Sequence, residues 1–347
     1  MVRGTFILGP CAAESREQVL VTARQIKDVC GNTPFIFRAG VWKPRTSPHT
    51  FQGIGEAALG WLSEVRASLG VPVATEVATP EHVDSALKAG IDYLWIGART
   101  SANPLAVSAL AEAIQVRCAD KSQTECALKG IFIKNPVNED AGLWLGNIER
   151  LEKTGIPVLA VHRGCNHRPC WRMAHKVRTE RPDIQMLLDP SHMSGNASKV
   201  PALMQKIPEL GLDGAMVEVH FQPECALSDK NQQLTPIQLG NNLEPIRSRL
   251  CSVSPTCPSK DEKELNWLRA EIDELDEQLW ATIAARMDVS KRIGAWKKAN
   301  HVAPLQPERY EKIVESLRSR AGQLGLSEEF MLNVWELIHE ESLRQQS

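Results

Sequence analysis

The sequence of 347 residues predicts an α/β protein in which a (β/α)8 TIM barrel is followed by a small all-α domain. Eight short apolar runs alternate with amphipathic helical segments between residues 5 and 250. This is the number of units, and about the chain length, that such a barrel needs. Beyond a Ser/Pro-rich stretch, apolar residues recur only at helical spacing. An open doubly wound sheet is the alternative for the first part, but it would usually contain fewer strands.

The predicted strands are short runs rich in β-branched, aromatic and aliphatic residues. They cover residues 6–9, 35–38, 73–76, 93–96, 131–134, 158–161, 186–189 and 215–218. Helical patterns lie between the strands, for example at 15–30, 80–89 and 104–117. We therefore expect the barrel domain to cover residues 1–250.

Residues 251–260 are rich in Ser and Pro and are expected to form a linker. From residue 261 to about 298 the apolar spacing predicts a single helix about 55 Å long. Two prolines end it, and shorter helices are expected at 308–324 and 327–346. Because a domain of residues 261–347 cannot cover so long a helix by itself, we expect an intertwined homodimer through the helical domain.

The composition excludes several classes of protein. With 43% hydrophobic residues, 24% charged residues and a net charge of −2, the chain has no general attraction for nucleic acid or membranes. The sequence contains no apolar run long enough for a transmembrane helix, and it begins without a signal-peptide core. Nine cysteines without a Cys-x-x-Cys pair fit reduced thiols better than a disulfide framework. We therefore expect a cytoplasmic protein.

A group of cations follows the second predicted strand. Arg38, Lys43 and Arg45 lie within eight residues of one another, and Thr46 adds a hydroxyl. Arginine forks match the oxygens of phosphates and carboxylates two at a time, and lysine adds a point charge. A solvated basic loop is the alternative, but much of this loop is apolar or turn-forming. The group therefore predicts an anion-binding site at the C-terminal end of a strand, where (β/α)8 barrels place their active groups.

Ionisable or metal-binding residues follow the other strands as well. They include Cys11, Glu76, Arg99, Lys134, His162, Arg163, Asp189, His192, Glu218 and His220. A barrel with a purely structural C-terminal face would not place such a group after every strand.

Four of the residues near the first, seventh and eighth strands could bind a metal ion. Cys11 ends the first strand, His192 follows the seventh, Glu218 lies on the eighth, and Asp229 lies in the loop after it. These strands are neighbours in a closed barrel. A thiolate, an imidazole and two carboxylates suit Mn²⁺, Fe²⁺, Co²⁺ or Zn²⁺. Each residue alone could be an ordinary structural residue, so only their joint placement indicates a site.

The barrel motifs resemble type I-beta 3-deoxy-D-arabino-heptulosonate 7-phosphate (DAHP) synthase. The matching segments, in order, are GPCAAES at 9–15, KPRT at 43–46, IGART at 96–100, IKNP at 133–136, HRG at 162–164, LDPSH at 188–192, EVH at 218–220 and ALSD at 226–229. The resemblance implies a divalent metal ion, Mn²⁺ before Fe²⁺, Co²⁺ or Zn²⁺, bound by Cys11, His192, Glu218 and Asp229. It assigns phosphoenolpyruvate to Arg38, Lys43, Arg99, Lys134 and Arg163, and erythrose 4-phosphate mainly to Arg45 and Thr46.

The implied reaction joins carbon 3 of phosphoenolpyruvate to the aldehyde of erythrose 4-phosphate and releases phosphate. Several fixed cations would offset the repulsion between the two anionic substrates. Lys43 or Lys134 could move a proton, and the sequence does not choose between them. Two features depart from the family pattern: His162 stands where an acidic residue is more usual, and no N-terminal regulatory extension precedes the barrel.

The segment LRAEIDELD at 268–276 resembles the opening of the all-helical AroQ class of chorismate mutase. This resemblance implies the rearrangement of chorismate to prephenate, without a cofactor, at Arg269, Arg286, Lys297, Arg309, Ser342 and Gln346. Helical spacing places Arg286 and Lys297 on one face, with Arg269 about a quarter turn away. Lys297 and Gln346 would donate to the ether oxygen as charge grows there. Gln306 stands where Asp is frequent in this class, and Tyr310 stands where Glu is usual.

These resemblances together predict a bifunctional enzyme of aromatic amino-acid synthesis, inhibited by prephenate or chorismate through the mutase domain. In a second interpretation, the helical domain is mainly a ligand sensor and dimerisation module. A third interpretation is the related synthase of 3-deoxy-octulosonate 8-phosphate. That synthase is expected to carry Lys-Ala-Asn rather than the Lys-Pro-Arg-Thr that begins at Lys43.

Overall fold

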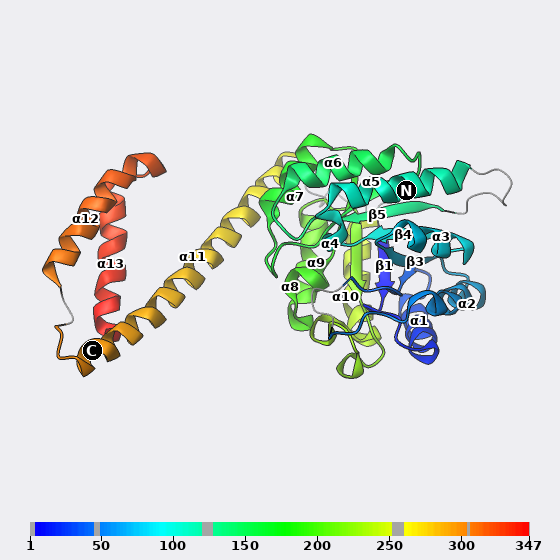
Figure 1. Cartoon of the computed structure of the whole chain (residues 1–347), viewed down its shortest axis with the longest axis horizontal. Helices are drawn as coiled ribbons and strands as arrows, with labels where there is room; N and C mark the ends of the chain where they lie inside the picture. The colour runs from blue at the N-terminus through cyan, green and yellow to red at the C-terminus, as the bar shows by residue number, and fades with distance from the viewer. Residues whose placement is uncertain (1–3, 45–48, 120–127, 252–259, 304–305, 347) are drawn as a thin grey trace. The chain divides into compact units, whose positions relative to one another are not determined.

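The computed structural model describes residues 4–44, 49–119, 128–251, 260–303 and 306–346. The chain forms two compact units, Met1–Glu271 and Ile272–Ser347. The first unit contains a barrel of parallel strands surrounded by helices, and the second contains helices alone (Figure 1). The fold class predicted from the sequence is confirmed.

The barrel is closed, and its eight strands are hydrogen-bonded to one another in sequence order. They are β1 Thr5–Gly9, β2 Ile36–Arg38, β3 Val73–Val77, β4 Tyr93–Ile96, β5 Gly130–Lys134, β6 Val158–His162, β7 Gln185–Leu188 and β8 Gly214–Glu218. The apolar runs therefore located all eight strands. The main difference is that the seventh strand ends one residue before Asp189, which instead caps the helix that follows.

Helices cover the outside of the barrel. They are α1 Arg16–Cys30, α2 Leu59–Leu69, α3 Pro80–Lys88, α4 Ala98–Ser101, α5 Pro104–Ala119, α6 Ala141–Glu152, α7 Trp171–Glu180, α8 Pro190–Ser194, α9 Val200–Glu209 and α10 Pro236–Cys251. Alternating strand residues divide the core in two. One set fills the barrel interior with side chains such as Trp95, Phe132 and Met216, and the other packs under the helices.

Polar residues lie where the strands end. Arg38, Lys134, His162 and Glu218 are the last residues of their strands, and all four are buried. A Cβ atom on Gly9 would lie 2.1 Å from the carbonyl oxygen of Arg38, so only glycine allows this approach of β1 to β2. The same end of the barrel thus has both a tightly packed backbone and a concentration of charge.

The helical segment begins with α11 Lys260–Ala299 and continues with α12 Pro307–Ala321 and α13 Glu328–Gln346. Residues 252–259 of the predicted linker lie outside the described part of the chain. The first turns of α11 belong to the barrel unit: Trp267 is only 3% exposed, packs against Trp171 and stacks on His175. His175 also contacts carboxylates of Glu264 and Glu271 at 3.1 and 2.7 Å.

In the second unit, α12 packs against α13, and these two helices lie side by side (Figure 1). Helix α11 meets α13 through side-chain pairs such as Arg286 and Ser342. Large apolar side chains remain exposed along α11, among them Leu275 at 62% and Leu279 at 51%.

Cys118 is disulfide-bonded, so the prediction of reduced thiols is wrong for this residue. That prediction rested on cysteine spacing and composition, neither of which reports which thiols meet in space. Cysteines 11, 30, 165, 170 and 225 are free. Within the described residues, no helix is long and apolar enough to cross a membrane.

Candidate active sites

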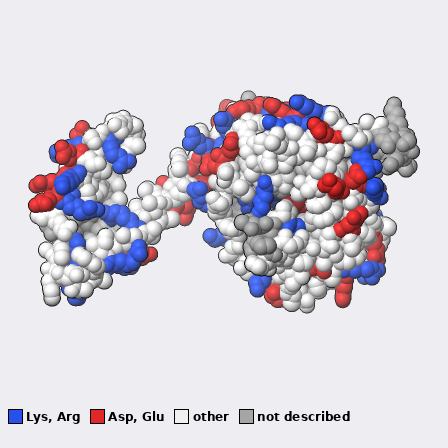
Figure 2. Space-filling model, in the orientation of Figure 1, with Lys and Arg blue, Asp and Glu red and all other residues white. Residues whose placement is uncertain are grey.

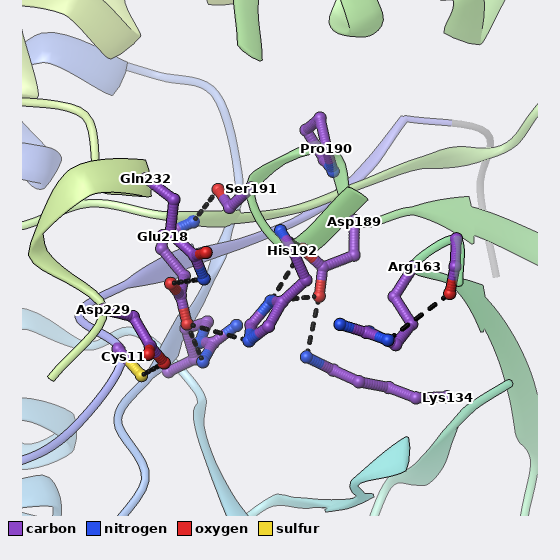
Figure 3. Close-up of polar contacts among 12 residues, drawn as sticks. Cys11, Lys134, Arg163, Asp189, Pro190, Ser191, His192, Glu218, Asp229 and Gln232 are labelled. Atoms are coloured by element: carbon purple, nitrogen blue, oxygen red, sulfur yellow. Dashed lines mark hydrogen bonds and ion pairs between the residues drawn. The ribbon is translucent and has the colours of Figure 1, made fainter. Parts of the chain in front are cut away.

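A cavity at the C-terminal end of the barrel brings together five cations that the sequence singled out. Its lining includes Arg38, Lys43, Arg99, Lys134 and Arg163, together with His192 and Asp229. These residues come from six different strand ends or the loops after them, and part of the group is drawn in Figure 3. Arg45 and Thr46, predicted to bind the second substrate, lie outside the described residues.

Arg38 is the most deeply placed of these cations. Its guanidinium is buried, donates from Nη2 to Glu218 Oε1 at 3.1 Å, and lies 4.7 Å from the centre of the Trp95 ring. Its Nε and Nη1 atoms are buried and have no hydrogen-bond partner in the described part of the chain. Buried N–H donors without partners are costly. An anion in the cavity would satisfy them.

The two lysines differ in their electrostatic surroundings. Lys134 Nζ lies 2.7 Å from Asp189 Oδ2; burial, helped by the charge of Arg38, lowers the pKa of Lys134 despite that carboxylate. Lys43 Nζ lies 3.7 Å from Glu76 Oε2. Burial alone would lower the pKa of Lys43, but its anionic neighbours, Cys11 and Glu76 first, raise it. Lys134 therefore has the more readily removed proton.

The predicted metal ligands gather beside the cations. One ligand atom from each of Cys11, Glu218 and Asp229 lies within 4.8 Å of the others. His192 Nε2 lies 3.5 Å from Glu218 Oε1 (Figure 3). The Cys11 thiol donates to Asp229 Oδ2 at 2.8 Å, and burial raises the pKa of that thiol. A thiol, two carboxylates and an imidazole make a donor set that fits a divalent transition-metal ion.

The residues proposed for the helical site also come together in part. Arg286 donates to the Ser342 hydroxyl and, at 3.3 Å, to the carbonyl oxygen of Ile338. Lys297 Nζ donates to Gln346 Oε1 at 3.2 Å. A Cβ atom on Gly294 would lie 2.6 Å from the Cα atom of Gln346, so glycine lets α11 and α13 approach there.

The two remaining predicted residues are not in this group. Arg309 lines a hollow on α12 whose lining includes Gln306 and Lys312 but none of the four residues above. Arg269 belongs to the first compact unit.

Comparison with known proteins agrees with this geometry. Residues 2–248 match the model of the DAHP synthetase I family, which is more than half of the chain. The chain belongs to the DAHP synthetase I family. Residues 268–347 match chorismate mutase type II. The chain is therefore a fusion of a DAHP synthetase I domain and a segment similar to chorismate mutase type II, as the sequence motifs indicated.

Individual relatives are similar over the barrel. A phospho-2-dehydro-3-deoxyheptonate aldolase of Thermotoga maritima is 30% identical over 234 residues, or 66% of this chain and 65% of the relative. A 2-dehydro-3-deoxyphosphooctonate aldolase of Legionella pneumophila is 27% identical over 249 residues, or 65% of this chain and 83% of the relative. The crystal structure of the Thermotoga DAHP synthase superposes with a TM-score of 0.59 at 25% identity, covering 71% of this chain and 68% of that one.

Several residues that support the synthase site were not assigned a role from the sequence. Asp189 binds His192 Nδ1 at 2.8 Å, and Gln232 donates to Glu218 Oε2 at 2.8 Å. Gln233 accepts the backbone N–H of Cys11 at 3.0 Å, and the Ser228 hydroxyl lies 2.9 Å from Cys11 Sγ. Asp189 was visible as a polar residue after a strand, but no spacing in the sequence indicates the two glutamines. All four side chains hold residues of the predicted metal site in place.

His162, the departure from the synthase pattern, is buried between the rings of Trp144 and Trp171. Its Nε2 atom lies 2.6 Å from the carbonyl oxygen of Pro169 and must carry the proton, because a carbonyl only accepts. Burial lowers the pKa of His162 to about 4. The residue next to Arg163 is therefore neutral at pH 7. The backbone N–H of Arg163 is held separately by Asn135 Oδ1 at 2.7 Å.

We expect His162 to make the synthase domain less stable in mild acid. A histidine has a pKa near 6.5 when unfolded. Because the folded-state pKa is lower, the unfolded chain binds more protons as the pH falls. This residue alone should then lower the free energy of unfolding by about 2 kcal/mol between pH 7 and pH 5. Urea unfolding at both pH values measures the difference.

His162→Gln should remove that part of the pH dependence, whereas His301→Gln, at an exposed position, should retain it. An equal pH dependence in wild type and His162→Gln would show that His162 is not held neutral.

Proposed function

We propose that this enzyme condenses phosphoenolpyruvate with erythrose 4-phosphate to give DAHP and phosphate, and separately converts chorismate to prephenate. The observation that carries the first activity is the shared cavity, in which five cations lie beside a thiol, an imidazole and two carboxylates. Two phosphorylated substrates need both features, because their mutual repulsion must be offset while one aldehyde is activated.

The cations divide the work of binding. Arg38 has two buried nitrogen atoms without a hydrogen-bond partner among the described residues, and it suits the carboxylate or phosphate of phosphoenolpyruvate. Arg99, Arg163, Lys43 and Lys134 surround the same space. Arg45 and Thr46 remain our proposal for the erythrose 4-phosphate site on the basis of their motif alone.

Cys11, His192, Glu218 and Asp229 would hold a divalent ion, Mn²⁺ before Fe²⁺, Co²⁺ or Zn²⁺, which supplies Lewis-acid stabilisation of the aldehyde oxygen. Asp189 keeps the imidazole of His192 in a fixed orientation, and Gln232 does the same for Glu218. Between the two candidate lysines we choose Lys134 for proton transfer, because its lowered pKa makes it the better donor.

The related octulosonate synthase is the competing function, since relatives with that name match over the barrel. The KPRT motif at 43–46 and the fused mutase domain favour DAHP synthesis. The aldehyde that the enzyme accepts decides between the two.

For the mutase, Arg286 would grip a carboxylate of chorismate, and Lys297 with Gln346 would donate to the ether oxygen. Arg269 and Arg309 would complete the site in a homodimer in which α11 pairs with a second copy. The exposed apolar residues of α11 support that pairing, because a monomer would leave them in water.

The helical domain also gives a route to regulation. We propose that prephenate or chorismate bound there lowers the synthase rate. The first turns of α11 pack into the barrel unit through Trp267, so the two domains share one helix. In the alternative interpretation the domain senses ligand and dimerises with little turnover, and Tyr310 favours that view.

Chelation should abolish the synthase reaction, and Mn²⁺ should restore it, because the four ligands otherwise lack the ion that activates the aldehyde. Consumption of phosphoenolpyruvate is measured with erythrose 4-phosphate and, in parallel, with arabinose 5-phosphate. Cys11→Ala should stay at least about 100-fold below wild type at every Mn²⁺ concentration. Cys30→Ala, at a buried cysteine outside the site, is the matched control and should recover fully.

Activity untouched by a strong chelator would eliminate the proposed metal site. Faster turnover with arabinose 5-phosphate would instead support the octulosonate synthase.

The double variant Leu275→Glu, Leu279→Glu should be monomeric where the wild type is dimeric, because four carboxylates would enter the apolar seam between two copies of α11. Analytical ultracentrifugation gives the mass of each. Ala281→Glu, on the opposite face of the helix, is exposed in the same way and should remain dimeric. A wild-type chain that sediments as a monomer at micromolar concentration would rule out the proposed pairing.

Saturating prephenate should lower the synthase rate of the wild type several-fold, and Arg286→Ala should lose this response because the effector no longer binds. Arg292→Ala, which changes an exposed cation on the same helix, should retain it. If prephenate leaves the wild-type synthase rate unchanged, the proposal of feedback through the helical domain is wrong. Mutase turnover measured on the same samples shows whether the helical domain is catalytic or only binds the ligand.

A further inference from the structure

His339 lies on the same face of α13 as two residues of the proposed mutase site. Ser342 and Gln346 follow it at i+3 and i+7, the spacing of one helical stripe. Ser342 is hydrogen-bonded to Arg286, and Gln346 to Lys297. The His339 side chain therefore continues the row of groups that faces α11.

The ring of His339 is held by aromatic neighbours. It stacks on the ring of Trp335, with the two ring centroids 4.8 Å apart and the ring planes at 12°. The centroids of the His339 and Tyr310 rings lie 5.3 Å apart in a T-shaped arrangement, and Tyr310 belongs to α12. The Tyr310 hydroxyl reaches Glu336 at 3.4 Å. The imidazole is thus held against the rings of Trp335 and Tyr310.

The Nε2 atom of His339 is buried and has no hydrogen-bond partner among the described residues. Buried polar atoms are nearly always paired, so an unpaired one at a binding site indicates a group that a ligand completes. Among the described residues of the second unit, His339 Nε2 is the one buried side-chain nitrogen or oxygen without a hydrogen-bond partner.

The charges around His339 indicate which kind of ligand group its Nε2 atom would bind. Burial lowers the pKa of His339, and the positive charges of Arg286 and Lys297 lower it further, against the opposing effect of Glu336 and Glu340. The ring is therefore neutral at pH 7, and a neutral imidazole suits a neutral partner. Chorismate and prephenate each carry two carboxylates and one ring hydroxyl, and the carboxylates are better matched to the cations.

We propose that Nε2 of His339 forms a hydrogen bond with the ring hydroxyl of chorismate and prephenate, so that His339 is a substrate-binding residue of the mutase. This rests on the proposed mutase function. Trp335 and Tyr310 position the ring, and the bond helps to select a hydroxylated substrate.

The decisive variant is His339→Phe, which keeps an aromatic ring between Trp335 and Tyr310 but removes both nitrogens. With chorismate, kcat/KM should fall about 10- to 100-fold, the range expected when one hydrogen bond to a substrate hydroxyl is lost. With a chorismate analogue that has hydrogen in place of the hydroxyl, wild type and His339→Phe should agree within about twofold. His339→Gln, whose amide can still bond to a hydroxyl, should recover part of the loss.

Two controls separate binding from folding. The synthase rate without prephenate reports whether the barrel unit of each full-length variant is folded, because His339 lies in the other compact unit. Turnover of the deoxy analogue reports whether the helical unit is folded. Trp335→Phe disturbs the same aromatic stack and should affect chorismate and the deoxy analogue equally.

Calorimetry of prephenate binding gives a second readout that needs no turnover. The dissociation constant of prephenate should rise in His339→Phe but not in a folded control variant. Equal prephenate affinity in wild type and His339→Phe would overturn the proposal, as would an equal loss for chorismate and its deoxy analogue. A wild type that neither turns over chorismate nor binds prephenate would instead remove the mutase function itself and this inference with it.

Discussion

The buried ion pair between Arg38 and Glu218 connects the two halves of the synthase site. Arg38 ends β2 and Glu218 ends β8, and both strands pair with β1, which carries Cys11 just beyond its end. A charge in this position must be paired, because an unpaired buried charge costs several kcal/mol. The pair leaves two guanidinium nitrogens for an anion and one carboxylate oxygen, held by Gln232, beside the metal ligands. The proposed anion site and the proposed metal site are therefore parts of one electrostatic unit.

This arrangement also explains why the backbone is so tightly specified at this end of the barrel. Gly9 allows β1 to approach the backbone of Arg38, and Gly97 leaves room for the Glu76 carboxylate that faces Lys43. A side chain at either position would displace a charged partner by more than a hydrogen bond tolerates. The charges are thus positioned by the closure of the barrel rather than by flexible side chains that find each other in solvent.

Periodicity was sufficient to predict the barrel and its strand ends, because alternating burial leaves a direct trace in the sequence. It also indicated that Cys11, Glu218 and Asp229 would meet, since closure of eight strands makes the first and last neighbours. Gln232, Gln233 and Asn135 could not be predicted in this way, because their partners are fixed by loop conformation. The burial of Trp267 in the barrel unit was missed as well: within a helical pattern, a tryptophan carries no sign of which domain it packs against. The same limit made the cysteine prediction wrong at Cys118.

Both sites use a neutral histidine close to arginine, and for a common physical reason. Burial and adjacent positive charge each disfavour the imidazolium ion, so the pKa values of His162 and His339 are lowered. Beside Arg163 and Arg286, a charged histidine would compete for the same anionic groups, whereas a neutral one leaves the arginine charge available to the substrate. In the barrel, the His162 ring donates to the carbonyl oxygen of Pro169, and the role of His162 is structural. In the helical domain, Nε2 of His339 has no hydrogen-bond partner among the described residues, so the same electrostatic setting leaves it available to the substrate hydroxyl that we propose.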